Sequence, residues 1–185
     1  MQEKREILEI SDEMLVKGCI KNDRKIQELL YRKFSREMYN ICLAYETDRD
    51  EAKDVLQEGF IKVFRSIETF DKQGSLKGWI RRIMTNTAID HWRISSKEDK
   101  FISIDFLTPT DQPVESPVTS FNCSDIMNQV SRLPSGARLI FNLYALEGYS
   151  HKEIAEKLNI SEGTSKSQVN RARQLLQQNL GDFIQ

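Results

Sequence analysis

The stretch that most constrains the fold runs from residue 147 to residue 176, because it holds two short helical patterns separated by a tight polar turn. Ser150 stands three residues before Glu153, which is the spacing of a capping box, so a first helix is predicted to begin there. Ser161 closes the turn of residues 159–161, where it can accept a hydrogen bond from the free amides of a second, longer helix. The segment therefore predicts a helix-turn-helix.

The two predicted helices each have an apolar face, and the second also has a polar face suited to DNA. The residues predicted to face inward are Ile154, Ala155 and Leu158 in the first helix, and Val169, Ala172 and Leu176 in the second. The opposite side of the second helix carries Lys166, Ser167, Asn170, Arg171 and Gln174. A helix fits the major groove, where Arg, Lys and Asn read base edges. The alternative is a helical hairpin whose basic face is merely solvated.

Length and composition indicate one or two globular domains. Of the 185 residues, 39% are hydrophobic and 30% are charged, and no apolar run is long enough to cross a membrane. Residues 1–14 are charged and lack the apolar core of a signal peptide, so we expect a cytoplasmic protein. Cys19, Cys42 and Cys123 are odd in number and widely spaced, which favours buried thiols over disulfides or a zinc site.

The net charge of −1 conceals two segments of opposite sign. Between residues 48 and 58, five acids face two bases, whereas between residues 76 and 93 four bases face one acid. A locally basic segment is what the phosphates of a nucleic acid attract. The near-neutral total is therefore compatible with DNA binding.

The first half of the chain is predicted to be helical. Residues 1–45 have apolar positions at helical period, which predicts two or three helices, with Asn22 as a cap between the first and second. A further helix is predicted from Asp50 to Ile67, with Leu56, Phe60, Val63 and Ile67 in the core. Another face of that helix carries Asp54, Gln57, Glu58 and Ile61. Taken alone, this face fits either a solvated surface or a docking site.

A basic, aromatic helix is predicted after the loop that contains Gly74, with Ser75 as its cap. The residues predicted to face inward are Trp79, Ile83 and Ala88, and those available for phosphates or bases are Arg81, Arg82, Asn86 and Arg93. Phe70, Trp79 and Trp92 interleave with these cations, and aromatics beside cations stack single-stranded bases. The alternative is that these aromatics belong to the core.

Residues 95–125 break the helical pattern and hold three of the four prolines in the chain. Residues 105–125 carry four acids and no Lys or Arg, so we interpret the segment as an extended linker. A short helix is predicted over residues 126–133, and another starts at Pro134 and ends at Gly148. The predicted fold class is all-α, with helical domains at residues 1–95 and 126–185 and a flexible linker at 96–125.

Three segments, in this order, resemble those of the extracytoplasmic function (ECF) sigma factors, small two-domain bacterial sigma factors of the sigma-70 family. DVLQEGFIKVF at 54–64 resembles their polymerase-docking helix, and GSLKGWIRRIMTNTAIDHWR at 74–93 resembles the helix that melts the promoter and reads its minus-ten element. The helix-turn-helix resembles their minus-thirty-five-reading module through Ser-Glu-Gly-Thr at 161–164, Lys166-Ser167 and Asn170-Arg171-Ala172-Arg173. Departures from the family pattern are Phe64 for Trp, Thr87 for Leu and Ser165 for an apolar residue.

The resemblance implies a role for particular residues. The residues implied to dock on the clamp helices of the largest polymerase subunit are Asp54, Gln57 and Glu58. Phe70 and Asn86 are implied to hold an extruded minus-ten base, with Trp79 and Arg82 supporting the melted strand. Those implied to face the minus-thirty-five duplex are Lys166, Ser167, Asn170, Arg171 and Arg173.

These features predict a sigma factor that binds core RNA polymerase, directs it to promoters and opens the DNA. We expect no enzymatic activity, cofactor, metal or membrane insertion, because no phosphate loop, catalytic set or metal-ligand cluster occurs in the sequence. An anti-sigma factor is a further candidate partner. The alternative is a stand-alone helix-turn-helix regulator whose N-terminal half senses a ligand or dimerises, although such a protein has no need of the pattern at residues 54–93. A nuclease is disfavoured for want of a metal-binding carboxylate cluster.

Overall fold

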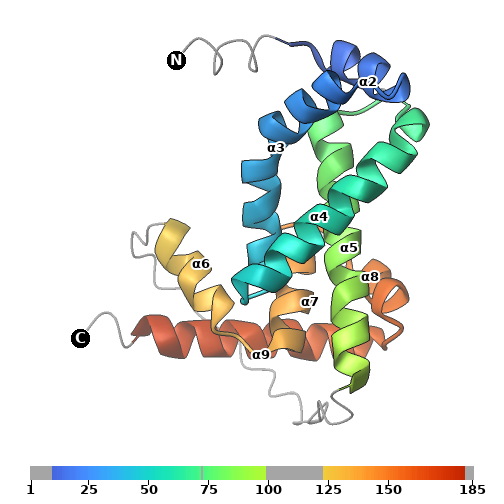
Figure 1. Cartoon of the computed structure of the whole chain (residues 1–185). Coiled ribbons are helices and arrows are strands. Elements are labelled where there is room, and N and C mark those ends of the chain that lie inside the picture. The colour runs from blue at the N-terminus through green and yellow to red at the C-terminus, as the bar shows by residue number, and fades with distance from the viewer. Residues whose placement is uncertain (1–9, 72, 99–122, 182–185) are drawn as a thin grey trace. The chain divides into compact units, whose positions relative to one another are not determined.

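The computed structural model describes residues 10–71, 73–98 and 123–181. Within these ranges every regular element is a helix, which confirms the predicted all-α fold (Figure 1). The chain divides into two compact units, residues 1–95 and 96–185. Most of the predicted linker, residues 99–122, lies outside the described residues.

The α-helices of the first unit begin at side-chain caps. Its elements are α2 (Asp12–Ile20), α3 (Arg24–Tyr45), α4 (Arg49–Ser66), the short 3₁₀ helix η1 (Ile67–Thr69) and α5 (Leu76–Glu98). Ser11, Asp23 and Asp48 accept hydrogen bonds from the first free amides of α2, α3 and α4. Ser75 likewise accepts from the amide of Gly78 at 3.0 Å, as predicted for the cap of α5.

The predicted cap at Asn22 is wrong by one residue. Asn22 adopts a left-handed conformation with φ of 56°, and Asp23 is the residue whose carboxylate accepts from the amides of Lys25 and Ile26. Asn is one of the few residues that tolerate the left-handed region, so it closes the turn between α2 and α3. The extended capping position then falls to Asp23.

The core of the first unit is formed by stripes of apolar residues on α3, α4 and α5. The residues buried along these stripes are Leu30, Phe34, Met38 and Cys42 of α3, Val55, Leu56, Phe60 and Val63 of α4, and Leu76, Ile80, Met84 and Ala88 of α5. The prediction for α4 is thus confirmed. For α5 it is partly wrong, because Ala88 is buried but Trp79 and Ile83 are only half-buried. The core-facing stripe of α5 is rotated by about one residue toward Ile80 and Met84, which lets Met84 pack on α4.

Cys19 and Cys42 are buried, free thiols in this core, as expected. Burial raises the pKa of Cys19 to about 11 and that of Cys42 to about 12, so both stay protonated at neutral pH. A protonated, buried thiol is a poor nucleophile. These two cysteines therefore act as small apolar core residues.

The second unit contains α6 (Cys123–Ser131), α7 (Ser135–Ala145), α8 (His151–Leu158) and α9 (Glu162–Gly181). One cluster of its core joins α6, α7 and α9 through Val130, Leu133, Ala137, Ala172 and Leu176. Pro134 precedes α7 as predicted, and Gly148 turns the chain after that helix with φ of +75°. Nη1 of the buried Arg138 donates to the carbonyls of Ser131 and Leu133, both at 3.2 Å, and so satisfies the C-terminal end of α6.

Candidate nucleic-acid interface

The outer side of α4 presents the polar set that the sequence singled out. Asp54, Gln57 and Glu58 are exposed, while the other side of the helix is buried in the core. Ile61 lies one turn beyond and is 42% exposed. We call Asp54, Gln57, Glu58 and Ile61 the acidic face. It is a negatively charged surface with an apolar residue at one end, on a helix whose other side is buried in the core.

Lys62 connects the acidic face to α5. Its Nζ lies 2.9 Å from Oε1 of Glu58 and 3.3 Å from Oδ2 of Asp90. Partial burial lowers the pKa of Lys62, but the hydrogen bonds to the two carboxylates outweigh this effect and leave the pKa above its ordinary value. This link between α4 and α5 was not predicted from the sequence. The four-residue spacing of Glu58 and Lys62 could have indicated half of it, whereas the pairing with Asp90 depends on the packing of α4 and α5.

The loop after η1 and the start of α5 bring two aromatic residues together. The rings of Phe70 and Trp79 have centroids 5.7 Å apart and planes inclined by 56°. Both side chains are half-buried, so neither belongs fully to the core. Trp79, Arg82 and Asn86 follow each other at i, i+3 and i+7 on α5, which places them on one side of the helix. Arg82 is exposed and Asn86 is half-buried.

The predicted helix-turn-helix is confirmed by α8 and α9. The amide of Ser150 donates to Oε2 of Glu153 at 2.8 Å, and the amide of Glu153 donates back to Oγ of Ser150 at 3.3 Å. This is the predicted capping box. In the turn, Asn159 takes a left-handed conformation, and Oγ of Ser161 accepts from the amide of Thr164 at 2.9 Å. Local sequence signals thus set both ends of the motif.

The outer face of α9 carries the residues predicted to meet DNA. Val169, Ala172 and Leu176 are buried as predicted. Lys166, Asn170, Arg173 and Gln174 are exposed, whereas Ser167 and Arg171 are half-buried. Oγ of Ser167 donates to the carbonyl of Thr164 at 3.0 Å. The guanidinium carbon of Arg173 lies 5.7 Å from the ring centroid of Tyr144, so this cation also contacts α7.

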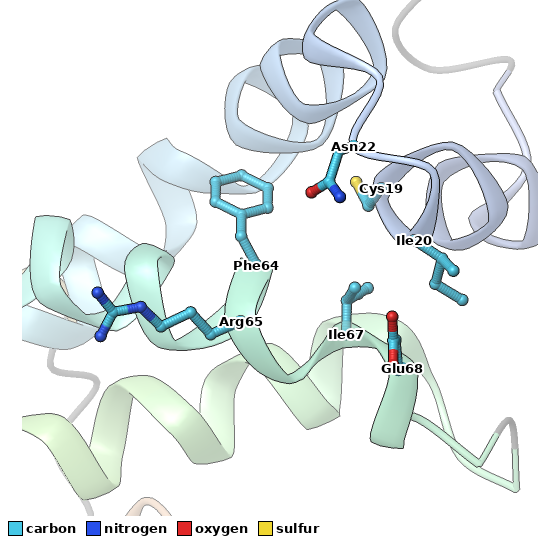
Figure 2. A pocket seen from close by; sticks show the side chains of 7 residues that line it. All are labelled: Cys19, Ile20, Asn22, Phe64, Arg65, Ile67 and Glu68. Carbon is cyan, nitrogen blue, oxygen red and sulfur yellow. The ribbon is translucent and has the colours of Figure 1, made fainter.

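A cavity of about 310 Å³ lies between the C-terminal end of α2 and the end of α4 (Figure 2). Its lining residues are Cys19, Ile20, Asn22, Phe64, Arg65, Ile67 and Glu68. Phe64, which stands where the ECF pattern has Trp, contributes to the wall. None of the residues predicted to contact polymerase or DNA lines this cavity.

In the part of the chain that the structure describes, no group of three or more His, Cys, Asp or Glu side chains is placed to hold a metal ion. Among the same residues, no helix is both long enough and apolar enough to cross a membrane.

Comparison with known proteins assigns both halves of the chain. The model of sigma-70 region 2 matches residues 30–98, and that of sigma-70 region 4 matches residues 124–176. The ECF RNA polymerase sigma factor SigW of Bacillus subtilis is 30% identical, over 92% of this chain and 100% of its own length. The chain belongs to the extracytoplasmic function sigma factors. This confirms the family that the three sequence segments resemble.

Other relatives agree with the assignment. The ECF RNA polymerase sigma factor SigM of Bacillus subtilis is 31% identical over 80% of this chain and 90% of its own length. The ECF RNA polymerase sigma-E factor of Haemophilus influenzae is 27% identical over 91% of this chain and 95% of its length. The sigma factor RpoE of Bartonella quintana, solved in complex with the anti-sigma factor NepR, has the same fold at a TM-score of 0.50 and 21% identity, over 83% of this chain and 96% of that one.

As a sigma factor, the chain binds core RNA polymerase, directs it to promoter DNA and acts in transcription initiation without being an enzyme itself. The match to region 2 spans both α4 and α5. That match decides against a stand-alone helix-turn-helix regulator with an unrelated sensing domain.

Proposed function

We propose that this sigma factor docks on the clamp helices of the largest polymerase subunit through the acidic face of α4. Asp54, Gln57 and Glu58 are exposed together, and the buried side of α4 prevents the helix from turning them away. Charged groups on such a surface steer association and fix its orientation, while an exposed apolar residue such as Ile61 supplies contact area. The docking partner is therefore a positively charged surface with an apolar contact.

The minus-ten element is recognised as a melted strand at Phe70, Trp79, Arg82 and Asn86. Extruding a base costs a few kcal/mol, which a protein without ATP hydrolysis must recover from stacking and hydrogen bonding. Stacking on an aromatic side chain is worth about 1–3 kcal/mol per base. The half-buried Phe70 and Trp79 offer ring edges and faces, and the amide of Asn86 has both a donor and an acceptor for a base edge.

The minus-thirty-five element is read as a duplex by α9, through Lys166, Ser167, Asn170, Arg171 and Arg173. The exposed cations and amide lie on a helix whose opposite side is buried, which is the geometry of a recognition helix in a major groove. In this assignment residues 1–95 form region 2, residues 126–185 form region 4, and the protein works in the cytoplasm, where its polymerase is.

One observation carries the proposal: three sets of exposed or half-buried polar and aromatic residues lie on α4, on α5 with the loop before it, and on α9, and each of these helices is buried on its opposite side. Reconstitution with core polymerase tests it, followed by run-off transcription on genomic fragments. We expect stable co-purification and transcripts that start downstream of a shared pair of upstream sequence elements. Transcripts without a shared minus-thirty-five sequence would contradict the role of α9, whereas failure to co-purify would contradict the role of α4.

A further inference from the structure

Ser165 is a polar residue in the core of the helix-turn-helix. Its side chain is fully buried, at 0% exposure, on the inner side of the first turns of α9. Serine favours helices less than alanine or leucine, and a buried hydroxyl without a partner costs about 1–3 kcal/mol on mutational scales. A serine here therefore requires a partner that compensates for its burial.

The partner is His151, the first residue of α8. Its Nδ1 lies 3.0 Å from Oγ of Ser165, and the hydroxyl can donate or accept according to the imidazole tautomer. The imidazole ring is also stacked on Tyr144 of α7, with centroids 4.6 Å apart and planes inclined by 14°. The stack restrains the plane of the imidazole ring, and the contact with Ser165 favours the one of its two flipped orientations in which Nδ1 faces Oγ.

A second contact completes a link among three helices. Tyr144 also lies beneath the guanidinium of Arg173, which is on α9 eight residues after Ser165. Eight residues correspond to about 12 Å along a helix. The helix α9 is thus held at two points, by a hydrogen bond near its start and by a cation–π contact about two turns later. The hydrogen bond is made to His151 and the cation–π contact to Tyr144, and these two residues are stacked on each other.

We infer that His151 and Ser165 are positioning residues that set the rotation and axial position of α9, and so aim its DNA-reading face. The inference rests on the proposed role of α9 at the minus-thirty-five element. Lys166 follows Ser165 directly, and Asn170 lies one turn beyond, so any rotation at Ser165 moves both. A helix that turns by one residue swings its side chains by about 100°, and a hydrogen bond weakens steeply as its angle departs from linear. Apolar packing alone is less directional.

The test uses polymerase reconstituted with the full-length protein, on promoters found by run-off transcription. The measured quantity is discrimination, the ratio of binding to a promoter and to the same promoter with a scrambled minus-thirty-five element. In Ser165→Ala we expect discrimination to fall about twofold to tenfold, the effect of one lost hydrogen bond. Ser131→Ala is the matched control, because Oγ of Ser131 donates to the carbonyl of Asn128 within α6 itself. It should leave discrimination unchanged.

A double variant separates positioning from stability. Ser165→Ala alone leaves Nδ1 of His151 without its partner, so we expect its melting temperature to fall. In His151→Phe with Ser165→Ala, both polar partners become apolar and an aromatic ring is kept against Tyr144. The melting temperature of this double variant should therefore be close to that of the wild type. If the pair positions α9, discrimination stays low in this double variant. Discrimination that recovers together with the melting temperature, or that is normal in Ser165→Ala, would overturn the inference. A wild-type protein that does not discriminate at all would instead overturn the proposed role of α9, and the inference with it.

Discussion

Gly59 of α4 lies directly against the side chain of Met84 on α5. A Cβ atom at Gly59 would collide with the sulfur of Met84, which is itself fully buried. The absence of a side chain at this position lets the two helices approach closely. Because α4 carries the acidic face and α5 carries the minus-ten residues, this contact sets the spacing between the two proposed surfaces of the first unit.

We expect Gly59→Ala to lower the free energy of unfolding. Alanine favours a helix over glycine by about 1 kcal/mol, but overpacking a tight core costs about 1–3 kcal/mol, and the buried Met84 has little room to move. Denaturant unfolding measures the net change. In the double variant Gly59→Ala with Met84→Ala, the shorter side chain at residue 84 should make the destabilising effect of Gly59→Ala smaller than it is in the wild-type background. Gly163→Ala on α9 is the control, since a Cβ there meets only Ser161 at an ordinary 3.5 Å; equal effects at both glycines would contradict the contact.

Reversing the charge of the acidic face should weaken polymerase binding. In Asp54→Arg with Glu58→Arg, two carboxylates become cations at the proposed interface, and like charges across an interface cost several kcal/mol. We expect the affinity for core polymerase to fall by about tenfold or more. The matched control is Glu13→Arg with Glu28→Arg, which makes the same charge change at two other exposed carboxylates of the first unit. If both double variants bind core polymerase alike, the acidic face is not the docking site.

Promoter opening should depend on Phe70 and Asn86 more than polymerase binding does. In Phe70→Ala the tilted ring contact with Trp79 is lost, so a stability loss of about 1 kcal/mol is expected beside the loss of a base-stacking surface. Phe70→Leu keeps apolar contact but not the π-face, and should also open promoters poorly. Asn40→Ala, at an exposed asparagine of α3, is the control for Asn86→Ala. Permanganate reactivity of promoter thymines at matched polymerase occupancy is the measurement, and normal reactivity would remove the residue from the site.

The sequence dependence and the salt dependence of DNA binding by Arg171→Ala should distinguish two roles for Arg171. If it contacts a base, Arg171→Ala should cost about 1–3 kcal/mol and relax specificity at one promoter position. If it contacts a phosphate, binding should weaken on all sequences alike, and the salt slope should fall by about one. Arg132→Ala, at an exposed arginine beyond α6, should do neither. Binding of the reconstituted polymerase to promoter variants at several salt concentrations distinguishes these outcomes, and no change would place Arg171 outside the interface.

The stability of the protein should fall in mild acid in a manner that depends on His151. Burial holds the pKa of His151 below its ordinary value, and the nearby Lys166 and Arg173 add to this effect against an opposing contribution from Glu162. An unfolded histidine titrates at about 6.5, so just below that pH the unfolded chain binds more protons than the folded one. The contribution of His151 to the free energy of unfolding is therefore present above that pH and is lost as the pH falls. We expect the melting temperature to drop more between pH 7 and 5 in the wild type than in His151→Phe; parallel curves would contradict this.

Several features of the protein follow from the sequence because they depend only on neighbouring residues. The capping box of Ser150 and Glu153, the cap at Ser161 and the buried stripe of α9 all arise from spacings within one or two helical turns. The order of the three segments was sufficient to identify the family. The prediction of a cap at Asn22 was wrong because two adjacent residues, Asn22 and Asp23, both suit a cap, and the backbone conformation decides between them.

Other features were decided only by the tertiary structure. On α5, the apolar residues Trp79 and Ile80 are adjacent, and helical periodicity alone allows a core-facing stripe through either of them. The close approach of Met84 to Gly59 of α4 buries the stripe that contains Ile80. The contacts of Lys62 with Asp90 and of His151 with Ser165 join different helices, so no local spacing reveals them. A helical period determines which residues share a face, whereas the packing of one helix on another determines which face is buried and which side chains meet.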